Sequence, residues 1–105
     1  MMSFNALFIS YAPDADKTIH RSTIKTGKYK LTTVIVKNLP EALEVCDELV
    51  KKEAIDSILL CPGFTHRDVA EIVAATDNKV AVVVARGDGP SAKIVQEAFK
   101  RAGYF

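Results

Sequence analysis

Apolar residues along the chain fall into short runs that alternate with longer amphipathic stretches. Three nearly continuous apolar runs, at residues 6–12, 57–61 and 79–85, have the length of strands that are buried on both faces. A fourth run, residues 29–36, is rich in β-branched side chains and begins with alternation, which is typical of an edge or near-edge strand. The pattern therefore predicts four strands.

Helical spacing fills two of the segments between these strands. Asn38 with Glu41 three residues later is a helix start signal, and apolar residues at spacings of three and four follow it as far as Val50. Thr65 and Asp68 form a second capping-box pattern ahead of another apolar stripe. We expect a helix after each of these signals.

Two more helices are predicted towards the ends of the chain. Asp16 can cap a short helix that runs through about Ile24. Residues 91–101 form a last helix, which Gly103 ends. Its apolar positions should face inward: Ile94, Val95, Ala98, Phe99 and Ala102.

Strands and helices thus alternate along the chain, and this order is typical of a parallel sheet with both faces covered. We expect one α/β domain over residues 1–105, a three-layer sandwich. Right-handed crossovers favour a small doubly wound, mostly parallel four-stranded sheet in the flavodoxin-like order 2-1-3-4, with helices on both faces.

Composition narrows the class of protein. The 14 basic and 13 acidic residues leave a formal net charge of +1, so no overall field attracts nucleic acid or an anionic membrane surface. The sequence shows no signal peptide and no run of about 20 apolar residues that could span a membrane. Two cysteines do not make a disulfide framework. We expect a cytoplasmic protein that binds neither nucleic acid nor membrane.

In a parallel sheet, the segments that follow the strands emerge at one edge, and ligands bind there at the point where the winding reverses. This places Tyr11, residues 61–67 and residues 86–88 near one another. The turn after the third strand holds a thiol, an imidazole and a guanidinium within seven residues. It is the first place to look for a ligand.

Cys61 has two interpretations. It is either a nucleophile activated by the following helix and by His66 or Arg67, or a small apolar residue that ends a buried strand. Cys61 to Arg67 also fits Cys-x5-Arg, the spacing of phosphatase and arsenate-reductase loops, although Pro62 removes one N–H that such a loop would use. Cys46 lies on the apolar stripe of a helix, which predicts a structural role.

The basic side chains near this edge are open to both functional and structural interpretations. Arg86 directly follows a strand and could bind a carboxylate or phosphate, or it could form an ion pair with Asp88 or Asp14. His66 is a candidate base or an exposed histidine, and His20 with Arg21 lies on the predicted first helix. Two histidines without paired spacing predict no metal site, and no cofactor motif is present.

Four short motifs together resemble a family of small α/β proteins of unknown function. They are Ala12-Pro13-Asp14-Ala15-Asp16, His20-Arg21, Leu60-Cys61 with Gly63-Phe64, and Val84-Ala85-Arg86. The resemblance covers about the first 86 residues and implies a compact α/β domain. It implies no activity, substrate or catalytic residue, and the family pattern does not require Arg67.

The leading hypothesis is a domain that binds a small anionic metabolite at the carboxyl edge of its sheet. The predicted ligand-binding residues are Tyr11, His20, Arg21, Cys61, Gly63, Thr65, His66 and Arg86. One alternative is a thiol-dependent enzyme, phosphatase- or reductase-like, with Cys61 and His66 as catalytic candidates. Another is a dimeric interaction or regulatory module. In each case we expect a homodimer that covers the edge strands. Tyr104 and Phe105 either suit its interface or cap the core of their own chain.

Overall fold

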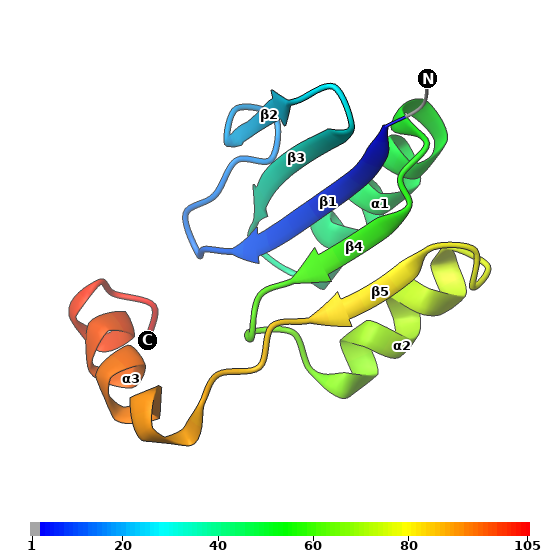
Figure 1. The fold of residues 1–105 in the computed structure, drawn as a ribbon. Helices are drawn as coiled ribbons and strands as arrows, with labels where there is room; N and C mark the ends of the chain where they lie inside the picture. The colour runs from blue at the N-terminus through cyan, green and yellow to red at the C-terminus, as the bar shows by residue number, and fades with distance from the viewer. Residues whose placement is uncertain (1–2) are drawn as a thin grey trace.

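The computed structural model describes residues 3–105 and has an α/β fold built on a five-stranded sheet in the order β2-β3-β1-β4-β5 (Figure 1). Strand β2 runs antiparallel to β3, and every other neighbouring pair in this sheet is parallel. The strands are β1 (Phe4–Tyr11), β2 (Arg21–Lys25), β3 (Tyr29–Val36), β4 (Ser57–Leu60) and β5 (Ala81–Val84). The sheet is therefore mixed but mostly parallel.

The predicted four-stranded, flavodoxin-like sheet is wrong because residues 16–24 do not form a helix. The Asp16 carboxylate accepts hydrogen bonds from the amide and the hydroxyl of Thr18, which closes a local turn in place of a helical N-cap. Residues 21–25 instead form β2, where Thr23 and Ile24 have the β-branched side chains that favour strands. Strand β2 adds a fifth, antiparallel edge beside β3.

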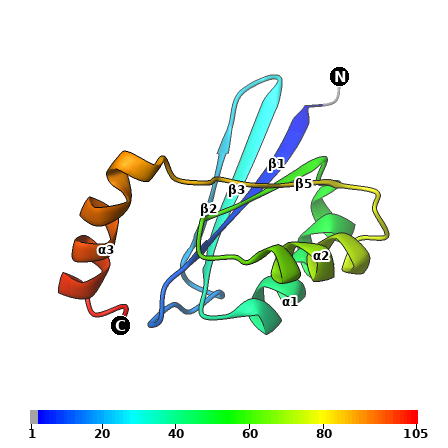
Figure 2. The ribbon, with the colours of Figure 1, turned by 90° about the horizontal axis from the view of Figure 1, so that it is seen from below.

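Helices cover one face of the sheet only, so the prediction of helices on both faces is also wrong. The helices α1 (Leu39–Glu53) and α2 (His66–Ala75) pack against each other and lie on the same face (Figures 1 and 2). Right-handed crossovers explain this, since the chain moves across the sheet in the same direction from β3 to β4 and from β4 to β5. The helix predicted at residues 16–24 would have been the one on the other face.

The third helix, α3 (Ala92–Arg101), follows a short 3₁₀ helix, η1 (Gly89–Ser91), and stands beyond the carboxyl ends of the strands (Figure 2). It makes no extensive contact with any strand, and none of its residues is buried. Ile94, which was predicted to face inward, is 70% exposed. The chain therefore ends in an amphipathic helix whose apolar side lacks the packing that its pattern predicts.

The core fills the space between the covered face of the sheet and the helices α1 and α2. Its largest fully buried side chains are Leu7, Ile9, Val34, Val36, Val45, Cys46, Ile58, Leu60 and Ile72. Both predicted helix starts are confirmed: Asn38 accepts a hydrogen bond from the Glu41 amide, and Thr65 and Asp68 form a reciprocal capping box. Over residues 3–105, no helix has the length and apolar character needed to cross a membrane.

Candidate functional site

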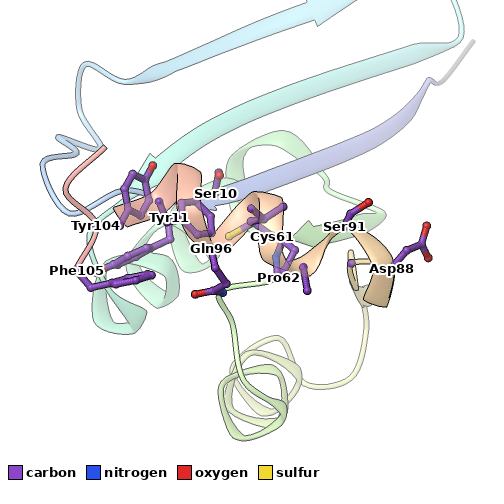
Figure 3. Close-up of a pocket in the computed structure, with 14 residues that line it drawn as sticks. Ser10, Tyr11, Cys61, Pro62, Asp88, Ser91, Gln96, Tyr104 and Phe105 are labelled. Atoms are coloured by element: carbon purple, nitrogen blue, oxygen red, sulfur yellow. The ribbon is translucent and has the colours of Figure 1, made fainter. Parts of the chain in front are cut away.

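A cleft of about 650 Å³ lies between the carboxyl edge of the sheet and α3 (Figure 3). Four segments form it: the end of β1, the loop after β4, the loop after β5, and α3 with the last two residues. The lining residues are Ser10, Tyr11, Cys61, Pro62, Gly63, Gly87, Asp88, Ser91, Ala92, Val95, Gln96, Phe99, Tyr104 and Phe105. The volume is within the range of about 300–1,000 Å³ that small-molecule sites have.

Aromatic side chains form one end of the cleft. Tyr104 stacks on Phe99, with ring centroids 4.6 Å apart, and meets Tyr11 edge to face at 6.3 Å. Figure 3 shows Tyr104 and Phe105 at this end and Asp88 at the opposite end. Such a group of rings offers flat apolar surfaces on which a planar ligand can stack.

The loop after β4 forms the floor beside these rings. The Cys61 amide donates to the Ile9 carbonyl at 3.1 Å, and the Phe64 amide donates back to the Cys61 carbonyl at 3.3 Å, so residues 61–64 form a tight turn. A Cβ on Gly63 would lie 3.6 Å from the Cys61 sulfur and 3.8 Å from the Tyr11 Cβ. The absence of a side chain at Gly63 therefore leaves open space next to both residues.

The polar groups in the cleft are few and mostly uncharged. They are the hydroxyls of Ser10, Tyr11, Ser91 and Tyr104, the amide of Gln96, the thiol of Cys61 and the carboxylate of Asp88. Asp88 is the single charged side chain among the lining residues, all of which the structure describes. The side chains of the cleft thus offer hydrogen bonds and one negative charge.

The structure brings together three of the eight predicted ligand-binding residues in this cleft, namely Tyr11, Cys61 and Gly63. The other five, His20, Arg21, Thr65, His66 and Arg86, do not line it.

His20 and Arg21 lie at the start of β2 and are engaged there. The Nδ1 atom of His20 accepts from the Asp16 amide at 2.8 Å. Arg21 donates from Nε to the Lys17 carbonyl at 2.7 Å and forms an ion pair with Glu48 on α1 at 3.2 Å. The hydrogen bonds from Thr18 lower the pKa of the Asp16 carboxyl and keep this turn in place. Both predicted site residues therefore hold the edge of the sheet.

The N-terminus of α2 is occupied by the chain itself. The Thr65 amide donates to the Asp68 carboxylate at 2.9 Å, and the Asp68 amide donates to the Thr65 hydroxyl at 3.1 Å. The carboxylate already supplies the negative charge that a helix N-terminus favours. A free anion would have to compete with it.

The Cys-x5-Arg spacing does not produce an oxyanion cradle in this loop. Such a cradle needs successive free N–H groups. Pro62 has none, the Phe64 amide is bonded to the Cys61 carbonyl, and the Thr65 amide is bonded to Asp68.

The two thiols lie in different surroundings. Cys61 is half-buried in the cleft, whereas Cys46 is fully buried on α1. Burial raises the pKa of the Cys46 thiol to about 12, so it stays protonated and has the structural role predicted for it. Within residues 3–105, no three His, Cys, Asp or Glu side chains gather in a way that could hold a metal ion.

Most of the cleft lies outside the site that the sequence predicted, because α3 supplies one whole wall. Val95 and Phe99 were expected to pack inward, and Tyr104 and Phe105 were expected either at a dimer interface or as a cap on the core. The signal that could have found them is the apolar stripe of a terminal helix that follows the last strand, at the same edge as the other loops.

Comparison with known proteins assigns the chain to a family but gives no activity and no ligand. Residues 4–100 match the model of a family described as "Family of unknown function (DUF6506)". No curated protein and no solved structure matches the chain.

Proposed function

The chain belongs to this family of unknown function, DUF6506, and we propose that it is a small-molecule-binding domain whose ligand occupies the cleft between the sheet edge and α3. One observation carries the proposal. A cleft of about 650 Å³ with aromatic side chains at one end and a few scattered hydrogen-bonding groups has the size and the chemistry of a site for a small organic molecule.

The side chains favour a planar, largely apolar ligand that is neutral or positively charged. Tyr104 and Phe99 offer stacking surfaces, Gln96 and the hydroxyls offer hydrogen bonds, and Asp88 offers a negative charge. The sequence favoured an anionic metabolite instead. An anion in the cleft would rely on neutral donors, because the Arg86 guanidinium donates to the Phe64 carbonyl and Arg21 is paired with Glu48.

Three molecules of nearly the same shape separate these ligand classes: neutral benzamide, cationic benzamidine and anionic benzoate. We expect benzamide and benzamidine to shift amide NMR signals of the lining residues and to raise the melting temperature more than benzoate does. A melting temperature raised by benzoate and inorganic phosphate alone, with the effect lost in Arg86→Ala, would instead establish the anionic ligand. No shift with any of the four would refute the binding proposal for this class of ligand.

A pair of neighbouring substitutions controls for indirect effects. Ala92 lines the cleft and Lys93 does not, although both are exposed on α3. Ala92→Trp should fill the cleft and abolish binding of the probes, whereas Lys93→Trp should leave their affinity unchanged. Equal loss in both variants would mean that the probes do not bind in the cleft.

A second candidate function, thiol-dependent chemistry, has one observation in its favour: the Cys61 sulfur lies in the cleft, where a bound molecule could reach it. His66, the predicted base, is outside the lining. The test is the rate at which iodoacetamide alkylates Cys61 near neutral pH. Alkylation faster than that of an ordinary thiol, with a pKa of about 8.5, would favour this function, and an ordinary rate would exclude it.

A further inference from the structure

Within the part of the chain that the structure describes, no helix packs on the second face of the sheet, which is open except at its carboxyl edge, where Ser10 lines the cleft beside α3 (Figure 1). Side chains alternate along a strand, so Leu7 and Ile9 point towards α1 and α2 and their neighbours point to the other face. The strand register aligns Phe8 with Leu59 and Leu59 with Val83 in one row across that face. Val83 is 49% exposed.

This face carries the chemistry of an interior. Its residues are Phe4, Ala6, Phe8, Ser10, Ser22, Ile24, Tyr29, Leu31, Thr33, Ile35, Ser57, Leu59, Ala81 and Val83. Fourteen strand positions thus include no Asp, Glu, Lys or Arg, and Phe4 stacks on Tyr29 at 5.9 Å. A sheet face that stays in water usually carries polar side chains, and parallel strands are normally covered on both sides.

A second apolar surface without a partner lies on α3. Val95 and Phe99 point to the cleft of their own chain, but Ile94 and Ala98 lie on the neighbouring flank of the helix, away from the cleft. Ile94 is the most exposed large apolar side chain of the helix. The chain therefore carries both a bare apolar sheet face and an amphipathic helix with a free apolar flank.

We propose that two copies of the chain form a symmetric dimer in which the Ile94–Ala98 flank of each α3 packs on the uncovered sheet face of the partner, near Leu59. Within one chain, α3 stands beyond the carboxyl ends of the strands with Val95 and Phe99 in its own cleft, and it makes no extensive contact with its own sheet (Figure 2). In this position its Ile94–Ala98 flank can reach a sheet face only on another copy. In a two-fold dimer each copy supplies one helix and one face, so both surfaces of both copies are used.

The exposed apolar area suits such an interface. Six large side chains of the face are exposed, namely Phe4, Ile24, Tyr29, Ile35, Leu59 and Val83, and Ile94 adds to them from α3. With the partly exposed side chains between them, they offer at most on the order of 800 Å² per copy, which is about what one partner of a standard interface buries, and α3 would cover the part near Leu59. Tyr104 and Phe105, for which the sequence left open a dimer interface or capping of the core, line the cleft, and the proposed interface does not use them.

Molecular mass in solution tests the dimer. Sedimentation equilibrium of the full chain should give twice the 11.5 kDa of one copy at micromolar concentration. Leu59→Glu and Ile94→Glu should each give the mass of one copy, with an unchanged far-ultraviolet circular dichroism spectrum because both side chains are exposed. Ile19→Glu is the matched control, since Ile19 is 68% exposed, Ile94 is 70% exposed, and Ile19 lies outside the sheet face.

Mixing two variants tests whether the helix crosses to the partner. Leu59→Glu and Ile94→Lys should each be monomeric alone. A 1:1 mixture should form a dimer again, because it contains one unaltered helix–face contact and one in which a glutamate faces a lysine.

Three results would overturn the proposal. They are a wild-type chain that is monomeric at every concentration, a dimer that survives Leu59→Glu, and a dimer that is lost in Leu59→Glu but kept in Ile94→Glu.

Discussion

Arg86 donates a hydrogen bond from its guanidinium to the main-chain carbonyl of Phe64, 3.1 Å away, and so ties the loop after β5 to the loop after β4. The sequence placed Arg86 at the ligand-facing end of a strand with either a ligand or an ion pair as its partner. The partner is a backbone carbonyl, and the bond holds the turn that forms the floor of the cleft.

Removal of this bond should cost stability. A hydrogen bond from a charged donor is worth about 1.5–3 kcal/mol, and partial exposure reduces that figure, so Arg86→Ala should lower the free energy of unfolding by about 1–2 kcal/mol. Urea denaturation of the wild type and the variant measures this difference in the free energy of unfolding. Arg86→Lys keeps one donor and should restore part of the loss. An Arg86→Ala protein as stable as the wild type would show that the bond does not hold the loop.

The end of α1 stores strain at Ala54. This residue adopts a left-handed conformation, with φ of 51°, in which alanine is unfavourable and glycine is not. The side-chain amide of Asn5 fixes the same point, since its Nδ2 donates to the carbonyls of Glu53 and Ala54 at 3.1 Å each. Ala54→Gly should raise the free energy of unfolding by about 1 kcal/mol, as measured in urea.

A matched substitution separates this effect from a general effect of glycine. Ala70→Gly, inside α2, should lower stability by about 1 kcal/mol, because there the backbone is helical and glycine costs entropy. Equal changes in the two variants would contradict the argument.

Four of the five strands could be predicted from the sequence, because long apolar runs and β-branched residues determine them locally. Residues 16–24 could not, because their local signal was an acidic residue that can cap either a helix or a turn. Thr18 decides the outcome by donating both its amide and its hydroxyl to Asp16. The loss of that helix also removed the cover of one sheet face, so one local error changed the layer architecture.

The position of the candidate site could be predicted from the sequence, but only some of the residues that line it could. Topology alone brings Tyr11 and Cys61 together at one edge, and the structure places both in the cleft. The positive side chains were assigned to the same edge from their sequence positions. Their actual partners, Glu48 for Arg21 and the Phe64 carbonyl for Arg86, are 27 and 22 residues away, and no local pattern reveals such contacts.

The capping box of α2 should contribute measurably to stability. Thr65→Ala removes the hydroxyl that accepts from the Asp68 amide, and loss of such a cap costs about 1 kcal/mol. Thr65→Ser keeps the hydroxyl and should cost much less. Thermal unfolding of the two variants beside the wild type checks this. If Thr65→Ala instead leaves stability unchanged and weakens phosphate binding, Thr65 is a ligand-binding residue, as the sequence suggested.

The buried thiol of Cys46 should make the protein less stable in alkali. Its pKa is raised by burial from 9.0 to about 12 in the folded chain, so between these values the unfolded chain loses a proton that the folded chain keeps. The stabilising contribution is complete below pH 9 and is lost progressively as the pH rises towards 12, by about 1.4 kcal/mol for each pH unit.

Lysines and tyrosines titrate in the same range, so the quantity to measure is the difference in free energy of unfolding between the wild type and Cys46→Ala, determined in urea at pH 7 and at pH 10. That difference should shrink by about 1.4 kcal/mol at pH 10, because only the wild type has the buried thiol. A constant difference would show that Cys46 ionises as easily in the folded chain as in the unfolded one.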